Sequence, residues 1–162
     1  QIMNEEVKYI SYEEAISVYA KMIDASDGGF DGVRDEGGIR AALEFVQNDM
    51  YYPNFSDKLC SLVYKFCSGH YFNDGNKRIA LTLGTYFLHK NSYFWQATIF
   101  MRQMESIVYH VAASNIDKDL LLRIMTCFMN GEDYDEELKI DIANAMSKGK
   151  LGINGEDYKV KD

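Results

Sequence analysis

The side chains that could do chemistry together are gathered in one run of nine residues, His70-Tyr71-Phe72-Asn73-Asp74-Gly75-Asn76-Lys77-Arg78. Histidine is a common general base in enzymes, so His70 could take a proton from a hydroxyl group. Asp74 offers a hard carboxylate oxygen, which suits the Mg²⁺ that accompanies a nucleotide. Lys77 and Arg78 add positive charge, and an arginine can hold two phosphate oxygens at once. A base, a metal-binding carboxylate and an anion site are the parts that phosphoryl transfer requires.

The second half of the run is suited to bind phosphate because it begins a predicted helix. The first backbone N–H groups of a helix lack partners within it and carry a partial positive charge. Gly75 lets the backbone approach a ligand without a Cβ atom in the way. The side-chain amide of Asn76 can donate a further hydrogen bond to an anion. The sequence therefore predicts an anion-binding site at residues 75–78.

Buried helices are predicted on both sides of the run. Before it, apolar residues recur at intervals of three and four between Leu59 and Phe66. Ser56 is the candidate N-cap of this helix, and Gly69 suits the position just past its end. After the run, residues 79–88 are apolar nearly all round, which is typical of a helix in the middle of a bundle. The run is therefore expected to be a loop between two central helices.

The rest of the chain also has the period of helices rather than the alternation of strands. Further helices are predicted at residues 11–24, 36–46, 98–113, 117–130 and 133–147. Ser11 with Glu14 has the spacing of a capping box, and Asp117 suits an N-cap position. Residues 93–95 are expected to be a short packed connector. The predicted fold class is all-α, a helical bundle.

Length and composition are those of one globular domain of 162 residues, 47% of them hydrophobic. The net charge of −8 argues against nonspecific nucleic-acid binding, which needs clustered lysine and arginine, but it suits a basic protein partner. No apolar run is long enough to span a bilayer, and the N-terminus lacks the apolar core of a signal peptide. The three cysteines lack metal-type spacing and are expected to be reduced thiols, as in a cytoplasmic protein.

The run resembles the signature of the Fic/Doc family, His-x-Phe-x-Asp/Glu-Gly/Ala-Asn-Gly/Lys-Arg, and fills each of its fixed positions. Upstream, residues 32–39 followed by 41–43 look like the segment that precedes the signature in death-on-curing (Doc) toxins. The resemblance covers roughly residues 9–130 in order and spacing. It implies a Fic/Doc-type helical bundle there, with a flexible N-terminus at 1–8 and a C-terminal helix and acidic tail at 131–162.

The resemblance implies a role for each residue of the site. His70 would take the proton from a target hydroxyl, and Asp74 would hold Mg²⁺. The backbone of residues 75–76 would form an anion hole for a phosphate of ATP or another nucleotide. The two cations, Lys77 and Arg78, would neutralise the charge on the transferred phosphate.

Three further residues are expected to support the site. Phe72 would be a hydrophobic anchor that pins the loop to the core. Arg34 and Asp35 would brace the site from the side through an ion pair. Tyr71 and Asn73 occupy variable positions of the signature and are expected to be exposed.

Residues 47–55 allow two interpretations. In Fic/Doc proteins the corresponding segment is a flap that docks an extended target peptide by strand-like pairing, and a short β-hairpin would serve that purpose. The polar and aromatic composition of the segment is also that of an ordinary aromatic loop.

The family has two main branches, which carry out different reactions, and this chain differs from each of them at particular positions. Members that transfer AMP have Gly where Lys77 stands and a second Arg where Leu81 stands. The Doc branch shares the Lys, and its activity is transfer of the γ-phosphate of ATP to a hydroxyl of elongation factor Tu. Gly75, where many Doc toxins have Ala, keeps AMP transfer open as an alternative. A member that only binds nucleotide or a partner is a second alternative.

The resemblance also bears on regulation. Many Fic proteins block their own site with a Ser/Thr-x-x-x-Glu-Gly/Asn helix. Residues 126–131 come closest to that pattern, but Asn130 stands where the Glu is needed. Inhibition by a separate antitoxin protein is therefore expected, as for Doc toxins.

Overall fold

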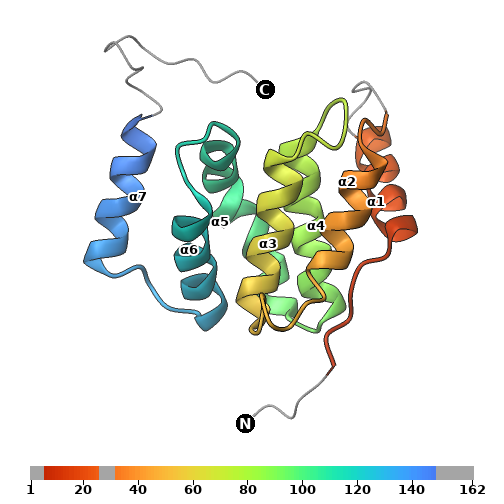
Figure 1. The fold of residues 1–162 in the computed structure, drawn as a ribbon. Coiled ribbons are helices and arrows are strands. Elements are labelled where there is room, and N and C mark those ends of the chain that lie inside the picture. Colours follow the sequence, from red (N-terminus) through yellow and green to blue (C-terminus); the bar gives the residue numbers. More distant parts are fainter. Residues whose placement is uncertain (1–5, 26–31, 149–162) are drawn as a thin grey trace.

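The computed structural model describes residues 6–25 and 32–148, which form a bundle of seven α-helices (Figure 1). In chain order they are α1 (Tyr12–Ala25), α2 (Glu36–Phe45), α3 (Phe55–Ser68), α4 (Asn76–Lys90), α5 (Phe94–Ala112), α6 (Lys118–Asn130) and α7 (Glu136–Lys148). The described residues form no strand, and a single β-bridge joins Val33 to Phe72. The all-α prediction is confirmed.

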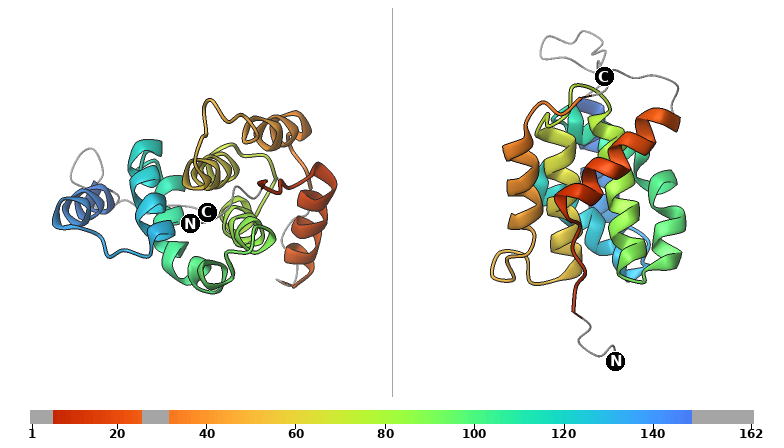
Figure 2. Two further views of the ribbon diagram at one scale, coloured as in Figure 1. Left: turned by 90° about the horizontal axis from the view of Figure 1, so that it is seen from below. Right: turned by 90° about the vertical axis from the view of Figure 1, so that its right-hand side faces the viewer.

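Helix α4 lies in the middle of the bundle, with α1, α3 and α5 packed around it (Figure 2). The residues that it buries are Ile79, Ala80, Leu83, Gly84, Phe87 and Leu88. Close approach to α5 requires the glycine, because a Cβ on Gly84 would lie 2.6 Å from the ring of Phe100. The two helices that flank the loop at residues 69–75 are thus held in the core, as predicted.

The capping predictions are confirmed at two helices and wrong at a third. Glu14 N–H donates to Ser11 Oγ at 3.1 Å, and Leu120 N–H donates to the carboxylate of Asp117 at 2.8 Å. Helix α3, however, begins one residue before Ser56 and is capped by Asn54, whose N–H donates to Asp57 at 2.9 Å. Asn54 has an acidic residue three positions on, as a capping box requires, whereas Ser56 is followed at that distance by an apolar residue.

The predicted connector at residues 93–95 is also wrong, because α5 starts there. Ala97 N–H donates to the carbonyl of Tyr93 at 2.9 Å, so the helix begins at Phe94. Phe94 and Trp95 lie in its first turn, and their side chains are 54% and 72% exposed rather than packed.

The segment at residues 47–55 is a loop of turns, so the hairpin interpretation is wrong. The side chain of Asn48 accepts hydrogen bonds from the N–H groups of Met50 and Tyr51, at 3.0 and 3.3 Å. These backbone donors are therefore engaged locally, as is usual for an Asn turn. The loop also lies at the opposite end of α3 from residues 69–75, about 20 Å away at 1.5 Å per helical residue (Figure 1).

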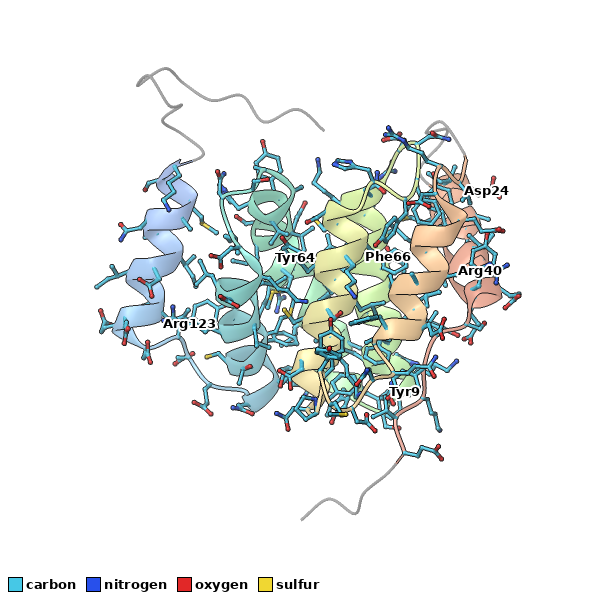
Figure 3. The ribbon with its side chains drawn as sticks, viewed as in Figure 1. Tyr9, Asp24, Arg40, Tyr64, Phe66 and Arg123 are labelled. Carbon is cyan, nitrogen blue, oxygen red and sulfur yellow. The ribbon has the colours of Figure 1, made fainter. Side chains whose placement is uncertain are left out.

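Both ends of the described chain are attached to the bundle. Lys8, which was predicted to belong to a flexible terminus, exchanges two hydrogen bonds with the side chain of Asn91, at 2.8 and 2.9 Å. Helix α7 packs on α6, and Arg123 on the side of α6 that faces α7 pairs with Asp141 at 2.6 Å (Figure 3). Residues 1–5 and the predicted tail at 149–162 lie outside the described residues.

The cysteines are free thiols, as predicted. Burial raises the pKa of both Cys60 and Cys67 to about 12, so these two sulfurs are poor nucleophiles. No helix in the described ranges has both the length and the apolar character needed to cross a membrane.

An ion pair between α1 and α4 predicts how stability depends on pH. Hydrogen bonds from Lys90 and then Tyr86 lower the pKa of Glu14 from 4.5 to about 2, and Lys90 Nζ lies 2.6 Å from its carboxylate. Because the folded-state pKa is the lower one, the pair stabilises the fold fully above pH 4.5 and is lost as the pH falls towards 2. We expect Glu14→Gln to lower the free energy of unfolding at pH 7 by about 1 kcal/mol, given the partial exposure of the carboxylate.

Urea unfolding at a series of pH values checks this expectation. The wild-type protein should lose more stability than Glu14→Gln between pH 4.5 and 2, so that the two curves converge in acid. Curves that run parallel over this range would show that the pair does not stabilise the fold.

Candidate active site

The loop that joins α3 to α4 begins with a change of backbone direction at His70. Helix α3 ends at Ser68, and Gly69 N–H still donates to the carbonyl of Lys65 at 2.8 Å. His70 then adopts the left-handed conformation, with φ of +51°, which is uncommon for a residue other than glycine. Its imidazole is exposed beside the C-terminal end of α3.

The side chain of Asn76 closes this loop. Its Oδ1 accepts a hydrogen bond from Phe72 N–H at 3.1 Å, and its Nδ2 donates to the carbonyl of Phe72 at 3.0 Å. The carboxamide therefore satisfies the backbone of the loop through its oxygen and one of its two N–H donors. Asn76 can still serve an anion through its backbone N–H, because it is the first residue of α4.

Asp74 and Arg78 face each other across the start of α4. One carboxylate oxygen of Asp74 accepts from Gly75 N–H at 2.8 Å, and the other lies 3.7 Å from the guanidinium of Arg78. Both side chains are nearly half exposed, at 47% and 43%, and the distance is too long for a hydrogen bond. The Asp74 oxygen on that side is therefore accessible to a ligand.

Gly75 is favoured at its position by its backbone conformation, and a Cβ there would be slightly crowded. Its φ is +80°, and an added Cβ would lie 3.1 Å from the methyl carbon of Met22 on α1. The first hydrogen bond of α4 runs from Ile79 N–H to the Gly75 carbonyl at 2.8 Å, so the N–H groups of residues 76–78 lie ahead of the helical ladder. This is the backbone arrangement that binds anions at helix starts.

The ammonium group of Lys77 lies between the loop and α5. Its Nζ is 5.6 Å from the centre of the Tyr109 ring, within the range of a cation–π contact. Burial lowers the pKa of Lys77, while the nearby Cys67 and Asp74 act in the opposite direction. The side chain is therefore held in a defined place next to the start of α4.

Arg34 and Asp35 lie beside the loop, but they brace it through their backbone. Their N–H groups donate to the carbonyl of Tyr71 at 2.8 and 3.0 Å. Among the described residues, neither Arg34 nor Asp35 forms the ion pair that was expected to brace the site. The carboxylate of Asp35 instead caps α2 and accepts from Gly38 N–H at 2.8 Å.

The strand-like neighbour of the loop is the segment just before Arg34, not residues 47–55. Asn73 N–H donates to the carbonyl of Gly32 at 3.0 Å, and Val33 forms an antiparallel bridge with Phe72. Val33 is also partly exposed. This pairing lies within the chain, and it differs from the pairing with a target peptide that the resemblance implied for residues 47–55.

Tyr71 is half buried, so its predicted exposure is wrong, whereas Asn73 is exposed as predicted. The Tyr71 ring meets the ring of Phe66 edge to face at 5.3 Å. A Cβ on Gly38 or on Gly69 would come within 2.6 Å of this ring, so the two glycines make room for it. Burial raises the pKa of the Tyr71 phenol, and Asp35 adds to the effect.

The loop is anchored to the core by Phe72, as predicted, and by Tyr19, for which no role at the site was predicted. Phe72 is 1% exposed and stacks on the ring of Tyr19 of α1, with ring centres 4.0 Å apart. The Tyr19 hydroxyl donates to the carbonyl of Asp74 at 2.9 Å. A tyrosine on an apolar helix face is itself a signal, because a buried hydroxyl needs a polar partner.

The described residues contain no group of three or more histidine, cysteine, aspartate and glutamate side chains that could enclose a metal ion. Mg²⁺ at nucleotide sites needs no such cage, because one or two carboxylates, phosphate oxygens and water complete its octahedron. The accessible carboxylate of Asp74, next to the start of α4, fits that mode of binding.

Comparison with known proteins agrees with this geometry. The family model described as the Fic/DOC family matches residues 9–88. The protein "Toxin Doc" of Mycolicibacterium smegmatis is 33% identical over 96 residues, which cover 57% of this chain and 74% of that protein. "Protein kinase doc" of Escherichia phage P1 is 35% identical over 88 residues, which cover 52% of this chain and 69% of that protein. With more than two thirds of both relatives matched and the signature loop inside the family match, the chain belongs to the Fic/Doc family.

Proposed function

We propose that this protein transfers the γ-phosphate of ATP to a serine or threonine hydroxyl of a target protein, and that it acts as the toxin of a toxin–antitoxin pair. The observation that supports the proposal is the loop at residues 70–78, in which an exposed histidine precedes a carboxylate and a lysine at the start of one helix. Lys77 stands where Doc toxins have Lys, and the two relatives are named as a toxin and as a protein kinase.

In the proposed reaction His70 takes the proton of the target hydroxyl as its oxygen attacks the γ-phosphorus. The new bond joins that oxygen to phosphorus, the bond from phosphorus to the bridging β–γ oxygen breaks, and ADP leaves. Lys77, Arg78 and the N–H groups at the start of α4 offset the negative charge that spreads over the transferred phosphoryl group. Mg²⁺, held by Asp74 and the phosphates, would supply further charge neutralisation when bound.

The proposed partners follow from the same assignment. Elongation factor Tu is the first target to test, because it is the acceptor known for the Doc branch. An antitoxin supplied as a separate protein would inhibit the site, since Asn130 replaces the inhibitory glutamate and is exposed at the end of α6. The reaction would take place in the cytoplasm, where both ATP and that target are found.

Transfer of AMP is the second candidate, and Gly75 is the observation that favours it. Its φ of +80° suits the glycine that AMP-transferring members carry at this position. Leu81 argues against it, because this half-buried residue packs on the core where those members have a second arginine for the nucleotide. The chain therefore lacks the second arginine that holds the nucleotide in those members, and its other cation, Lys77, stands four residues earlier.

Labelled ATP distinguishes the two reactions. We expect purified protein, incubated with elongation factor Tu, to transfer label from ATP labelled at the γ-phosphate and none from ATP labelled at the α-phosphate. Asp74→Asn should transfer about 10²-fold less, because it removes one charge at a site where electrostatic stabilisation is a large effect. Label that reaches the acceptor only from the α-position would replace the kinase proposal with AMP transfer.

A further inference from the structure

We propose that Tyr19 is a positioning residue of this site, which holds the Asp74–Gly75 peptide and thereby the direction of the Asp74 carboxylate. This inference rests on the proposed function and adds to it a residue that lies 51 positions before the signature begins. Tyr19 would act through Asp74 and would not touch the reacting atoms.

The position of Tyr19 is fixed from two sides. Its side chain is 2% exposed, and its ring stacks on Phe72 with an angle of 16° between the ring planes. The hydroxyl at the end of this clamped ring donates to the carbonyl of Asp74 at 2.9 Å. A buried hydroxyl that makes such a bond restrains its acceptor, because a movement of either group would cost this hydrogen bond.

Because Tyr19 restrains the Asp74–Gly75 peptide, this peptide in turn restrains the direction of the Asp74 carboxylate. The Asp74 carbonyl and the Gly75 N–H belong to one planar unit, so they move together. Tyr19 binds the carbonyl, and the N–H donates to one carboxylate oxygen of Asp74 at 2.8 Å. The other oxygen is thereby turned to the side of Arg78, 3.7 Å away, where a metal or nucleotide would bind.

Helix α1 supports the same peptide with two more side chains. A Cβ on Gly75 would lie 3.1 Å from the methyl carbon of Met22 and 3.6 Å from the terminal methyl of Ile23. Residues 19, 22 and 23 share one face of a helix, since neighbours three and four apart lie together. The third turn of α1 therefore packs against the Asp74–Gly75 peptide, and the Tyr19 hydroxyl makes the polar contact with that peptide.

Tyr19→Phe separates the hydroxyl from the ring. The variant keeps the stack on Phe72 and removes only the bond to the Asp74 carbonyl. We expect the gain in ATP affinity that MgCl₂ produces in calorimetry to fall about fivefold, as loss of one hydrogen bond predicts. ATP binding without Mg²⁺ should stay within about twofold of wild type, because the N–H groups that bind phosphate at the start of α4 are not touched.

Tyr86→Phe is the matched control. It removes a tyrosine hydroxyl that also joins α4 to α1, through Glu14, but two turns farther along α4 than the site. Circular dichroism shows that each variant is folded, and Tyr86→Phe should keep the full effect of Mg²⁺. This comparison separates a general loss of packing between the two helices from a change at Asp74.

The outcomes distinguish the inference from the function on which it rests. A wild-type protein that binds no nucleotide would overturn both. A wild-type protein whose affinity rises with Mg²⁺, matched by the same rise in Tyr19→Phe, would overturn the role of Tyr19 alone. Equal weakening of ATP binding with and without Mg²⁺ would also overturn it, because the hydroxyl would then serve the fold and not the carboxylate.

Discussion

Replacing His70 by alanine is expected to lower the rate of phosphate transfer by about 10²–10⁴-fold, the range for loss of a general base. Histidine is a common general base in enzymes, and the His70 imidazole lies exposed at the end of α3. Expression of the variant should therefore leave bacterial growth unaffected where the wild type arrests it. The measurement is growth after induction, together with transfer of label from ATP labelled at the γ-phosphate.

Two variants control for folding and for exposed histidines in general. His70 has φ of +51°, a conformation that asparagine tolerates better than alanine, so His70→Asn removes the base with less backbone strain. His89 is an exposed histidine on the last turn of α4, and we expect His89→Ala to keep the activity of the wild type. Equal growth arrest by wild type and both His70 variants would show that toxicity comes from binding rather than from catalysis.

Phe72→Ala is expected to reduce the free energy of unfolding by about 3–5 kcal/mol, as for other fully buried aromatic residues. The ring is 1% exposed and fills the space against Tyr19, so its loss leaves a cavity directly beneath the signature loop. Because the stability of a domain is only about 5–15 kcal/mol, the effect is large enough to reduce the yield of folded protein. Unfolding in guanidinium chloride, followed by circular dichroism, measures it.

Phe94→Ala is the matched control, because this phenylalanine is 54% exposed and should cost no more than about 0.5 kcal/mol. Phe72→Leu retains an apolar side chain and should recover most of the lost stability while leaving the stack on Tyr19 incomplete. If Phe72→Ala lost no more stability than Phe94→Ala, the loop would not be anchored by the core as the structure indicates.

The local features of this fold could be read from the sequence because they depend on residues a few positions apart. Apolar spacing located all seven helices, and the caps at Ser11 and Asp117 are confirmed. Gly75 at the start of α4 has φ of +80°, which is a property of its own turn. Gly69 stands just past α3 as expected, but its φ is −80°, and it is the ring of Tyr71 that requires its small size. The error at Ser56 arose from a competing cap only two residues away.

Contacts between helices and loops that are far apart in the sequence could not be predicted from such local patterns. A lysine on a helix such as Lys58 would be expected in solvent, yet it is 2% exposed. Its ammonium is bound by the carbonyl of Val46 at 3.2 Å and by the carboxylate of Asp49 at 2.7 Å. For residues 47–55 the sequence left two interpretations open, a flap hairpin and an ordinary aromatic loop, and it did not indicate that Val33 pairs with Phe72. That pairing depends on which end of α3 the chain passes (Figure 1).

The sequence by itself determined the helices, the position of the loop and the residue types that surround it, because periodicity, caps and a contiguous signature are properties of neighbouring residues. Only the tertiary structure decided how each side chain is used: that Asn76 closes the loop, that Asp35 caps a helix, and that the Tyr19 hydroxyl reaches Asp74. A hydrogen-bond partner on another helix depends on how whole helices pack, and that packing is fixed by the entire core at once.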